Sequence, residues 1–229
     1  MAGQIIIVSG TSGSGKSTTC ELFARRSEGF WLLYGIDHFL SGTFPARFGH
    51  HGPRSAEGFQ AIPMDASKPD GDLKWRFGEW GLKGFNVFHE WVAAASRAGC
   101  NIILDHLALV DPPILQDCIW RLQGLPVLFV SLKPPIEVLQ QRVEQRKMDK
   151  KMPTADFAGD DPMRRIIERL NRLRPWFYAA SYAAGEYDLE IDTDQHDPEQ
   201  VCELIERRLA QAPGNAFEHL RAKFPRGET

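Results

Sequence analysis

Cysteine is scarce in this chain and is never spaced for a metal site or a disulfide framework. The four cysteines are far apart and include no C-x-x-C pair: Cys20, Cys100, Cys118 and Cys202. This distribution excludes a small secreted fold held by disulfides and a zinc-ribbon type of site. We therefore expect free, mostly buried thiols in a reducing compartment.

Long apolar runs and a strong charge of one sign are also missing. The 229 residues carry a formal net charge of −3, which gives no reason to expect nucleic acid or an anionic membrane as a partner. No apolar run approaches the length that spans a bilayer, and the first residues lack a basic segment followed by a long apolar one. We expect a cytoplasmic protein and leave its oligomeric state open, a homo-oligomer included.

The most informative segment that is present is GTSGSGKS at residues 10–17, which fits G-x-x-x-x-G-K-[ST] at every position. It follows a strand-like apolar run at residues 5–8 and precedes a helix-compatible segment at 18–25. Its glycines let backbone N–H groups turn inward, and the following helix adds a partial positive charge. We expect a nucleoside triphosphate to bind at Gly10, Thr11, Ser12, Gly13, Ser14, Gly15, Lys16, Ser17 and Thr18. In this pattern Lys16 reaches the β/γ-phosphates and the Ser17 hydroxyl ligates Mg²⁺.

Short apolar runs alternate with helical patterns along residues 1–211, which we assign to one domain. Strands are expected at residues 5–9, 30–36, 100–104, 126–132 and 187–191, and helices at 80–98, 112–123, 135–147, 162–182 and 198–210. Strands separated by helices predict a five-stranded parallel sheet with helices on both faces, so the fold class is α/β. Residues 212–229 are expected to form a polar tail.

Residues 41–75 break this alternation, because they are rich in Gly, Pro and His and contain scattered aromatic residues. A long irregular insertion in a compact domain is usually functional or disordered. The aromatic residues favour partial order, so we predict one wall of a substrate pocket; a mobile surface loop is the alternative.

Two carboxylates are expected to follow strands. Asp37 ends the second strand, where it would face the crevice of the phosphate-binding loop and accept the proton of an acceptor hydroxyl. The alternative is that Asp37 caps a helix beginning at His38. Asp105 ends the third strand in the manner of a Walker B carboxylate and would hold Mg²⁺ with Ser17. The next residue, His106, is interpreted as a core or crevice histidine with a satisfied hydrogen bond.

Arg142 and Arg146 are spaced i, i+4 and therefore lie on one face of the helix after the fourth strand. Two guanidinium groups there would clamp the transferring phosphate. Together with the basic segment that follows, they indicate a lid over about residues 142–176. A solvated basic helix face is the alternative.

With these residues in hand, the chain resembles the chloramphenicol phosphotransferase family over roughly residues 4–205. The likeness rests on residues 10–18, on Gly35-Ile36-Asp37 after Trp31, on residues 103–105, on the arginine pair, and on residues 186–193, which end in Asp192-Thr193. The lid region looks longer than that of the family, and residues 42–72 are not close to the family's pocket segment.

The resemblance implies a three-layer P-loop kinase fold with a lid, using ATP and Mg²⁺ to phosphorylate a hydroxyl group of a small molecule, an antibiotic such as chloramphenicol among the candidates. It implies that Asp37 is the general base, that Lys16, Arg142 and Arg146 stabilise the phosphates, and that Ser17 ligates magnesium. The alternative function is a P-loop NTPase that acts as a hydrolase or a conformational switch.

Overall fold

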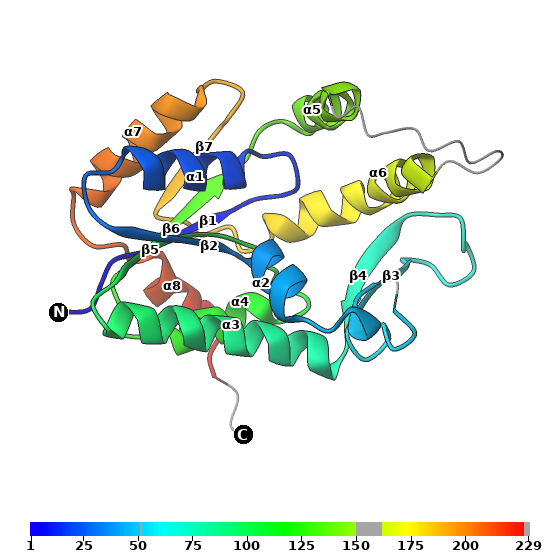
Figure 1. Ribbon diagram of the computed structural model, residues 1–229, viewed down its shortest axis with the longest axis horizontal. Helices are drawn as coiled ribbons and strands as arrows, with labels where there is room; N and C mark the ends of the chain where they lie inside the picture. Colours follow the sequence, from blue (N-terminus) through cyan, green and yellow to red (C-terminus); the bar gives the residue numbers. More distant parts are fainter. Residues whose placement is uncertain (51, 150–161, 227–229) are drawn as a thin grey trace.

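Five parallel strands form the central sheet of the computed structural model (Figure 1). They are β1 (Ile5–Ser9), β2 (Trp31–Gly35), β5 (Asn101–His106), β6 (Val127–Leu132) and β7 (Leu189–Ile191), in the order β2-β5-β1-β6-β7. The predicted α/β class with a five-stranded parallel sheet is confirmed. The structure describes residues 1–50, 52–149 and 162–226, and within them every side chain except those of residues 37, 40, 41, 143–149, 162–168 and 170.

The central strand β1 shows why these segments form a sheet covered on both sides. Its side chains alternate between two cores, with Ile5 and Ile7 in one and Ile6 and Val8 in the other. All four are essentially buried, as expected for a parallel strand between two helical layers.

Helices cover both faces of the sheet. On one face lie α1 (Lys16–Arg26) and α7 (Pro198–Leu209), and on the other lie α3 (Glu79–Arg97), α4 (Ile114–Arg121) and α8 (Ala216–Lys223) (Figure 1). No helix in the described part of the chain is long and apolar enough to cross a membrane.

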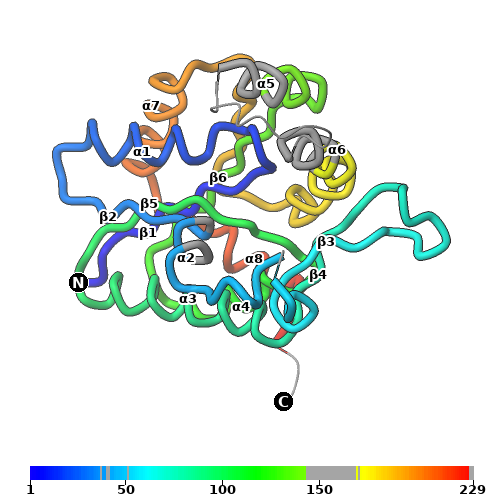
Figure 2. The backbone as a smooth tube through the Cα atoms, turned by 45° about the vertical axis from the view of Figure 1, so that its right-hand side comes forward, coloured from blue at the N-terminus to red at the C-terminus, as the bar shows by residue number. Residues whose placement is uncertain are grey.

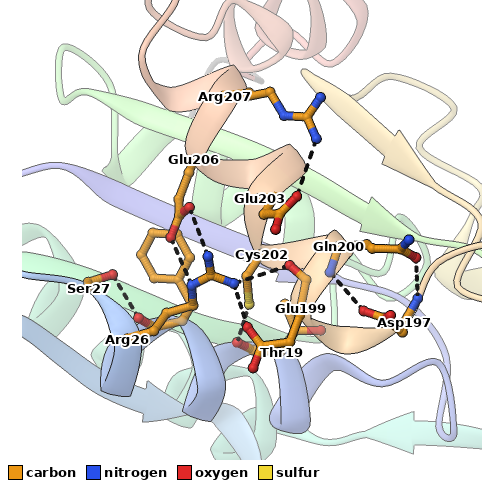
Figure 3. Close-up of polar contacts among 11 residues, drawn as sticks. Thr19, Arg26, Ser27, Asp197, Glu199, Gln200, Cys202, Glu203, Glu206 and Arg207 are labelled. Carbon is orange, nitrogen blue, oxygen red and sulfur yellow. Dashed lines mark hydrogen bonds and ion pairs between the residues drawn. The ribbon is translucent and has the colours of Figure 1, made fainter.

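The two helices of the first face are joined by polar contacts (Figure 3). Arg26 of α1 pairs with Glu199 at 2.6 Å and with Glu206 at 3.3 Å, both on α7. The start of α7 is fixed by a capping box, in which Asp197 accepts from the backbone N–H of Gln200 and the Gln200 side chain accepts from the backbone N–H of Asp197. The sequence-predicted helix start at Asp197-Pro198 is therefore confirmed.

The insertion at residues 41–75 is ordered around a hairpin that projects beyond the main sheet (Figure 2). It contains a 3-10 turn, η1 (Ala46–Phe48), and the antiparallel strands β3 (Phe59–Pro63) and β4 (Leu73–Phe77). Phe59 packs on Trp75 and Phe77 of the opposite strand, with ring centroids 5.9 and 6.3 Å apart. The aromatic residues thus build a small cluster of their own, and the choice between a pocket wall and a mobile surface loop stays a prediction.

The predicted lid, about residues 142–176, falls on parts of α5 (Ile136–Asp149) and α6 (Pro162–Ser181), and residues 150–161 between them lie outside the described residues. α6 packs on β4 of the hairpin (Figure 1). Arg172 donates from Nε to the carbonyl oxygen of Gly71 at 2.8 Å, and the Arg169 guanidinium lies 5.8 Å from the Trp75 ring centroid. The lid region and the insertion are therefore in direct contact.

The C-terminal segment differs from the expected polar tail, because residues 216–223 form α8 against the core. Phe217 and Leu220 are buried, three residues apart on one helical face. Asp188, just before β7, holds the start of this helix. Its Oδ1 accepts from the backbone N–H groups of Asn215 (2.7 Å) and Ala216 (3.0 Å), and its Oδ2 accepts from that of Phe129 in β6 (2.8 Å).

Replacing Asp188 by alanine is expected to lower the free energy of unfolding by about 3 kcal/mol, because three backbone N–H groups in β6 and at the start of α8 lose their charged acceptor. The Asp188 side chain is only 1% exposed, so water cannot readily replace it. Urea unfolding followed by circular dichroism measures the change, with Glu21→Ala, an exposed acid on α1, as the control. A loss no larger than that of the control would contradict this role.

Candidate functional site

The loop between β1 and α1 has the backbone of a phosphate cradle. Three of its glycines have positive φ: Gly10 at 147°, Gly13 at 88° and Gly15 at 98°. A Cβ at Gly10 would lie 2.5 Å from the carbonyl oxygen of Leu132, so only glycine fits there. The loop ends at the N-terminus of α1, where unpaired N–H groups and the helix dipole favour an anion.

Lys16 and Ser17 follow the loop in the first turn of α1. Lys16 donates from Nζ to the carbonyl oxygen of Thr11 at 3.1 Å, so its ammonium group folds back across the loop. Ser17 donates from Oγ to Oδ2 of Asp105 at 2.7 Å. The structure thus brings together two oxygen-bearing residues that sequence analysis proposed as metal ligands.

Asp105 is buried at the carboxyl end of β5, and Gly35 of β2 makes room for it. Gly35 is its register partner, and a Cβ there would lie 2.1 Å from Asp105 Oδ1. Within the described residues, Oδ1 is buried without a hydrogen-bond partner. An unpartnered carboxylate oxygen beside a serine hydroxyl suits Mg²⁺, which prefers hard oxygen ligands. Ser17 and Asp105 are the residues that would hold this ion.

Asp37 differs from its expected position at the end of a strand. Strand β2 stops at Gly35, and α2 (Ile36–Thr43) begins at once, so Asp37 is the second residue of that helix. The backbone therefore places it inside the helix rather than at the residue that precedes it. The predicted cap of a helix that begins at His38 is therefore wrong, since α2 already begins at Ile36. The Asp37 side chain lies outside the described residues, so its role as base stays a prediction.

Arg142 on α5 lies beside the phosphate loop and binds Thr193. Its Nη1 donates to Thr193 Oγ1 at 2.8 Å, and Thr193 Oγ1 in turn donates to the carbonyl oxygen of Ser14 at 3.1 Å. A cavity of about 460 Å³ is lined by this part of the loop, by Arg142 and by residues 193–198. The arrangement suits the nucleoside part of a nucleotide whose phosphates occupy the loop. The Arg146 side chain lies outside the described residues.

Replacing Arg142 by alanine is expected to raise KM for the nucleotide about tenfold, with a smaller fall in kcat, because it lines the cavity and holds Thr193. Steady-state kinetics at saturating acceptor measure the split, and Arg142→Lys keeps the charge but loses the fork geometry. A fall in kcat of a hundredfold with KM unchanged would instead indicate a clamp on the transferring phosphate.

Two residues that were not predicted as site residues hold the loop, Thr193 and Tyr182. The Tyr182 hydroxyl, just after α6, donates to the carbonyl oxygen of Leu132 at 2.7 Å and accepts from the N–H of Thr11 at 3.4 Å. Burial raises the pKa of Tyr182, which keeps this hydroxyl a donor. No local pattern marks Tyr182, whereas Thr193 was visible only as the end of the last strand.

His106 is a core histidine, as predicted, but only one of its ring nitrogens has a hydrogen-bond partner among the described residues. It is fully buried, and its Nε2 lies 2.8 Å from Nε2 of His89 on α3. Burial is the main cause that lowers the pKa of both imidazoles. His106 therefore faces the interior of the sheet rather than the nucleotide.

A second cavity lies beside the insertion. It has a volume of about 630 Å³ and is lined mainly by α2, by η1 and by the first half of α3. Its lining includes the aromatic side chains of Phe44, Phe48 and Trp80 and the positively charged side chains of Arg47 and Lys83. Trp80 thus lines a cavity, whereas Phe77 packs edge-on against Phe85 of the core at 5.3 Å. The pocket-wall role of the insertion stays a prediction.

Comparison with solved structures supports the fold. A sugar kinase from Janibacter sp. HTCC2649 aligns with a TM-score of 0.53 and 21% identity, covering 92% of this chain and 96% of that one. The Mycobacterium tuberculosis APS kinase, solved with AMPPNP and APS, aligns with a TM-score of 0.55 and 11% identity, covering 92% and 99%. At such identities the likeness shows the shared fold alone.

No curated protein matches the sequence. The model of one protein family matches residues 3–210, which include the phosphate loop, Asp37, Asp105 and Arg142. The resemblance predicted from the sequence is confirmed, and the chain belongs to the chloramphenicol phosphotransferase-like protein family.

Proposed function

We propose that this protein transfers the γ-phosphoryl group of ATP to a hydroxyl group of a small molecule. The observation that carries the proposal is that the glycine-rich phosphate-binding loop lies next to two oxygen-bearing side chains suited to Mg²⁺, those of Ser17 and Asp105. The glycine-rich loop leads directly into Lys16 and Ser17, and Ser17 is hydrogen-bonded to Asp105 of a neighbouring strand. Membership of the family supports the same activity.

In the proposed reaction the acceptor oxygen bonds to the γ-phosphorus while the bond from that phosphorus to the bridging oxygen of ADP breaks. The acceptor proton passes to the carboxylate of Asp37, at the start of α2. Mg²⁺, when held by Ser17 and Asp105, would neutralise charge on the phosphates. Lys16 would stabilise the same oxygens, with Arg142 and Arg146 approaching from the lid.

The acceptor would lie between α2 and the insertion, since Asp37 and the aromatic residues Phe44 and Phe48 belong to adjoining segments. Chloramphenicol is one candidate, because the family is named for it. The insertion of this chain is not close to the family's, so other hydroxyl compounds belong in the test.

The test is an acceptor screen with ATP and Mg²⁺, using mass spectrometry to detect a product heavier by one phosphoryl group. A panel of small-molecule alcohols that includes chloramphenicol is expected to yield at least one such product. ATP consumption that needs no alcohol and is unchanged in Asp37→Asn would instead indicate the hydrolase or switch alternative.

A further inference from the structure

Two histidines and a cysteine meet in the core on the sheet face opposite to α1. They are His89 on α3, His106 on β5 and Cys118 on α4, with exposed fractions of 1%, 0% and 2%. One potential ligand atom from each lies within 4.8 Å of the other two. The three residues come from three separate elements, and both helices lie on the same side of the sheet (Figure 1).

A carboxylate behind His89 fixes which nitrogen carries the proton. His89 Nδ1 lies 2.6 Å from Oδ2 of Asp117, and Arg121 donates from Nε to both oxygens of the same carboxylate, at 2.7 and 2.8 Å. Since Arg121 donates to both oxygens of this carboxylate, the carboxylate is the acceptor in its contact with His89, so Nδ1 of His89 donates and Nε2 is left with a lone pair.

This arrangement is the usual companion of a metal-bound histidine. A ligating histidine almost always donates its other ring N–H to a carboxylate, a carbonyl or water, which orients the ring and makes it a better ligand. Here the Nε2 lone pair of His89 is hydrogen-bonded to Nε2 of His106, 2.8 Å away. The Cys118 thiol, one residue after Asp117, completes a set of two nitrogens and one sulfur.

The chemistry of this set selects the metal. Imidazole and thiolate suit Zn²⁺, whereas Mg²⁺ requires oxygen ligands. In a tetrahedral zinc site the two nitrogens would be about 3.3 Å apart, given Zn–N bonds of about 2.0–2.1 Å. The observed contact would have to open by about half an ångström.

The geometry points to a zinc site with three protein ligands, His89, His106 and Cys118, in which Asp117 orients His89. Zn²⁺ replaces the hydrogen bond between the two imidazoles, and the Cys118 thiol loses its proton to solvent on binding. The site ties α3 and α4 to β5, the strand that carries Asp105. It is separate from the proposed Mg²⁺ site, since Asp105 and His106 are consecutive and point to opposite faces of the sheet.

Metal analysis of the untagged full chain, purified without chelators, tests the proposal directly. We expect about one zinc per chain by inductively coupled plasma mass spectrometry, and about tenfold less in Cys118→Ala. Cys202→Ala is the matched control, because Cys202 is equally buried but lies in the core on the opposite face of the sheet. It should retain the full zinc content.

Two further measurements keep the proposal testable if Cys118→Ala does not fold. Wild-type protein reconstituted with Co²⁺ should show a thiolate-to-cobalt charge-transfer band in the near ultraviolet, which histidine ligands alone do not give. Asp117→Asn should keep the ligands but weaken zinc affinity by about 10–100-fold, measured by competition with a chelating dye.

The result that would overturn the proposal is equally definite. Wild-type protein that holds less than about a tenth of an equivalent of zinc, both as purified and after incubation with Zn²⁺ or Co²⁺, has no such site. The two histidines would then be an ordinary hydrogen-bonded pair. Zinc retained in full by a folded Cys118→Ala variant would also overturn it, because the metal would lie elsewhere.

Discussion

Replacing Lys16 by alanine is expected to abolish phosphoryl transfer, lowering kcat/KM by about a thousandfold or more. Lys16 begins α1 and folds back over the loop to the Thr11 carbonyl, where its ammonium group would meet the β/γ-phosphates. We expect Lys16→Ala to bind the nucleotide more weakly as well. The increase in Tm that ATP and Mg²⁺ cause in the wild type should therefore disappear in the variant.

The control for this variant is Arg25→Ala, which removes one exposed cation from the same helix. It should keep both the turnover and the stabilisation by ATP. If Lys16→Ala bound and turned over nucleotide like the control, the assignment of the loop to the phosphates would be wrong, whatever the acceptor proves to be.

Replacing Asp37 by asparagine is expected to lower kcat by about 10²–10⁴, with little change in KM for ATP. Asparagine has the size of aspartate but cannot take the proton of the acceptor hydroxyl at neutral pH. The measurement is product formation with an acceptor found in the screen, together with ATP binding measured separately.

Glu21→Gln provides the control, since it makes the same chemical change at an exposed position of α1. A loss of Tm in Asp37→Asn with kcat unchanged would favour a helix-stabilising role, because Asp37 lies in the first turn of α2 and a carboxylate there interacts with the helix dipole. A loss of kcat with Tm unchanged supports the base.

Much of the fold could be predicted because its signals are local. The consecutive apolar residues of β1 predict a strand that is covered by helices on both faces of the sheet. The glycine pattern at residues 10–17 predicts the loop conformation that leads into α1. Asp197 followed by Pro198 marks the start of α7 for the same reason, since the cap and the fixed φ of proline act within one turn.

Features that depend on distant partners were missed. The β3–β4 hairpin is stabilised by rings that face one another across the strands, such as Phe59 and Trp75, so neither strand is evident alone. Asp37 was expected at the end of a strand, whereas β2 ends at Gly35 and α2 begins at Ile36. The residues around Asp37 do not show this, because the need for glycine at position 35 comes from the distant Asp105.

The candidate site also divides into residues with a local sequence signal and residues that depend on distant partners. Ser17 and Asp105 could be paired in advance, because a known loop pattern and a strand end both point to one edge of the sheet. Thr193 and Tyr182 could not be assigned, since their partners are loop carbonyl and N–H groups that any residue possesses. His89, His106 and Cys118 are brought together only by the packing of α3 and α4 under β5.

The position of α8 has a practical consequence for anyone who shortens this protein. The family match ends at residue 210, yet Phe217 and Leu220 fill part of the core beneath β6. A variant that ends at residue 210 would expose the apolar surface around Phe129 that Phe217 now covers. It would also keep only one of the three backbone N–H groups that donate to Asp188. Such a truncated variant is expected to aggregate, because it exposes apolar core surface. The boundary of the homologous region is therefore not the boundary of the folding unit.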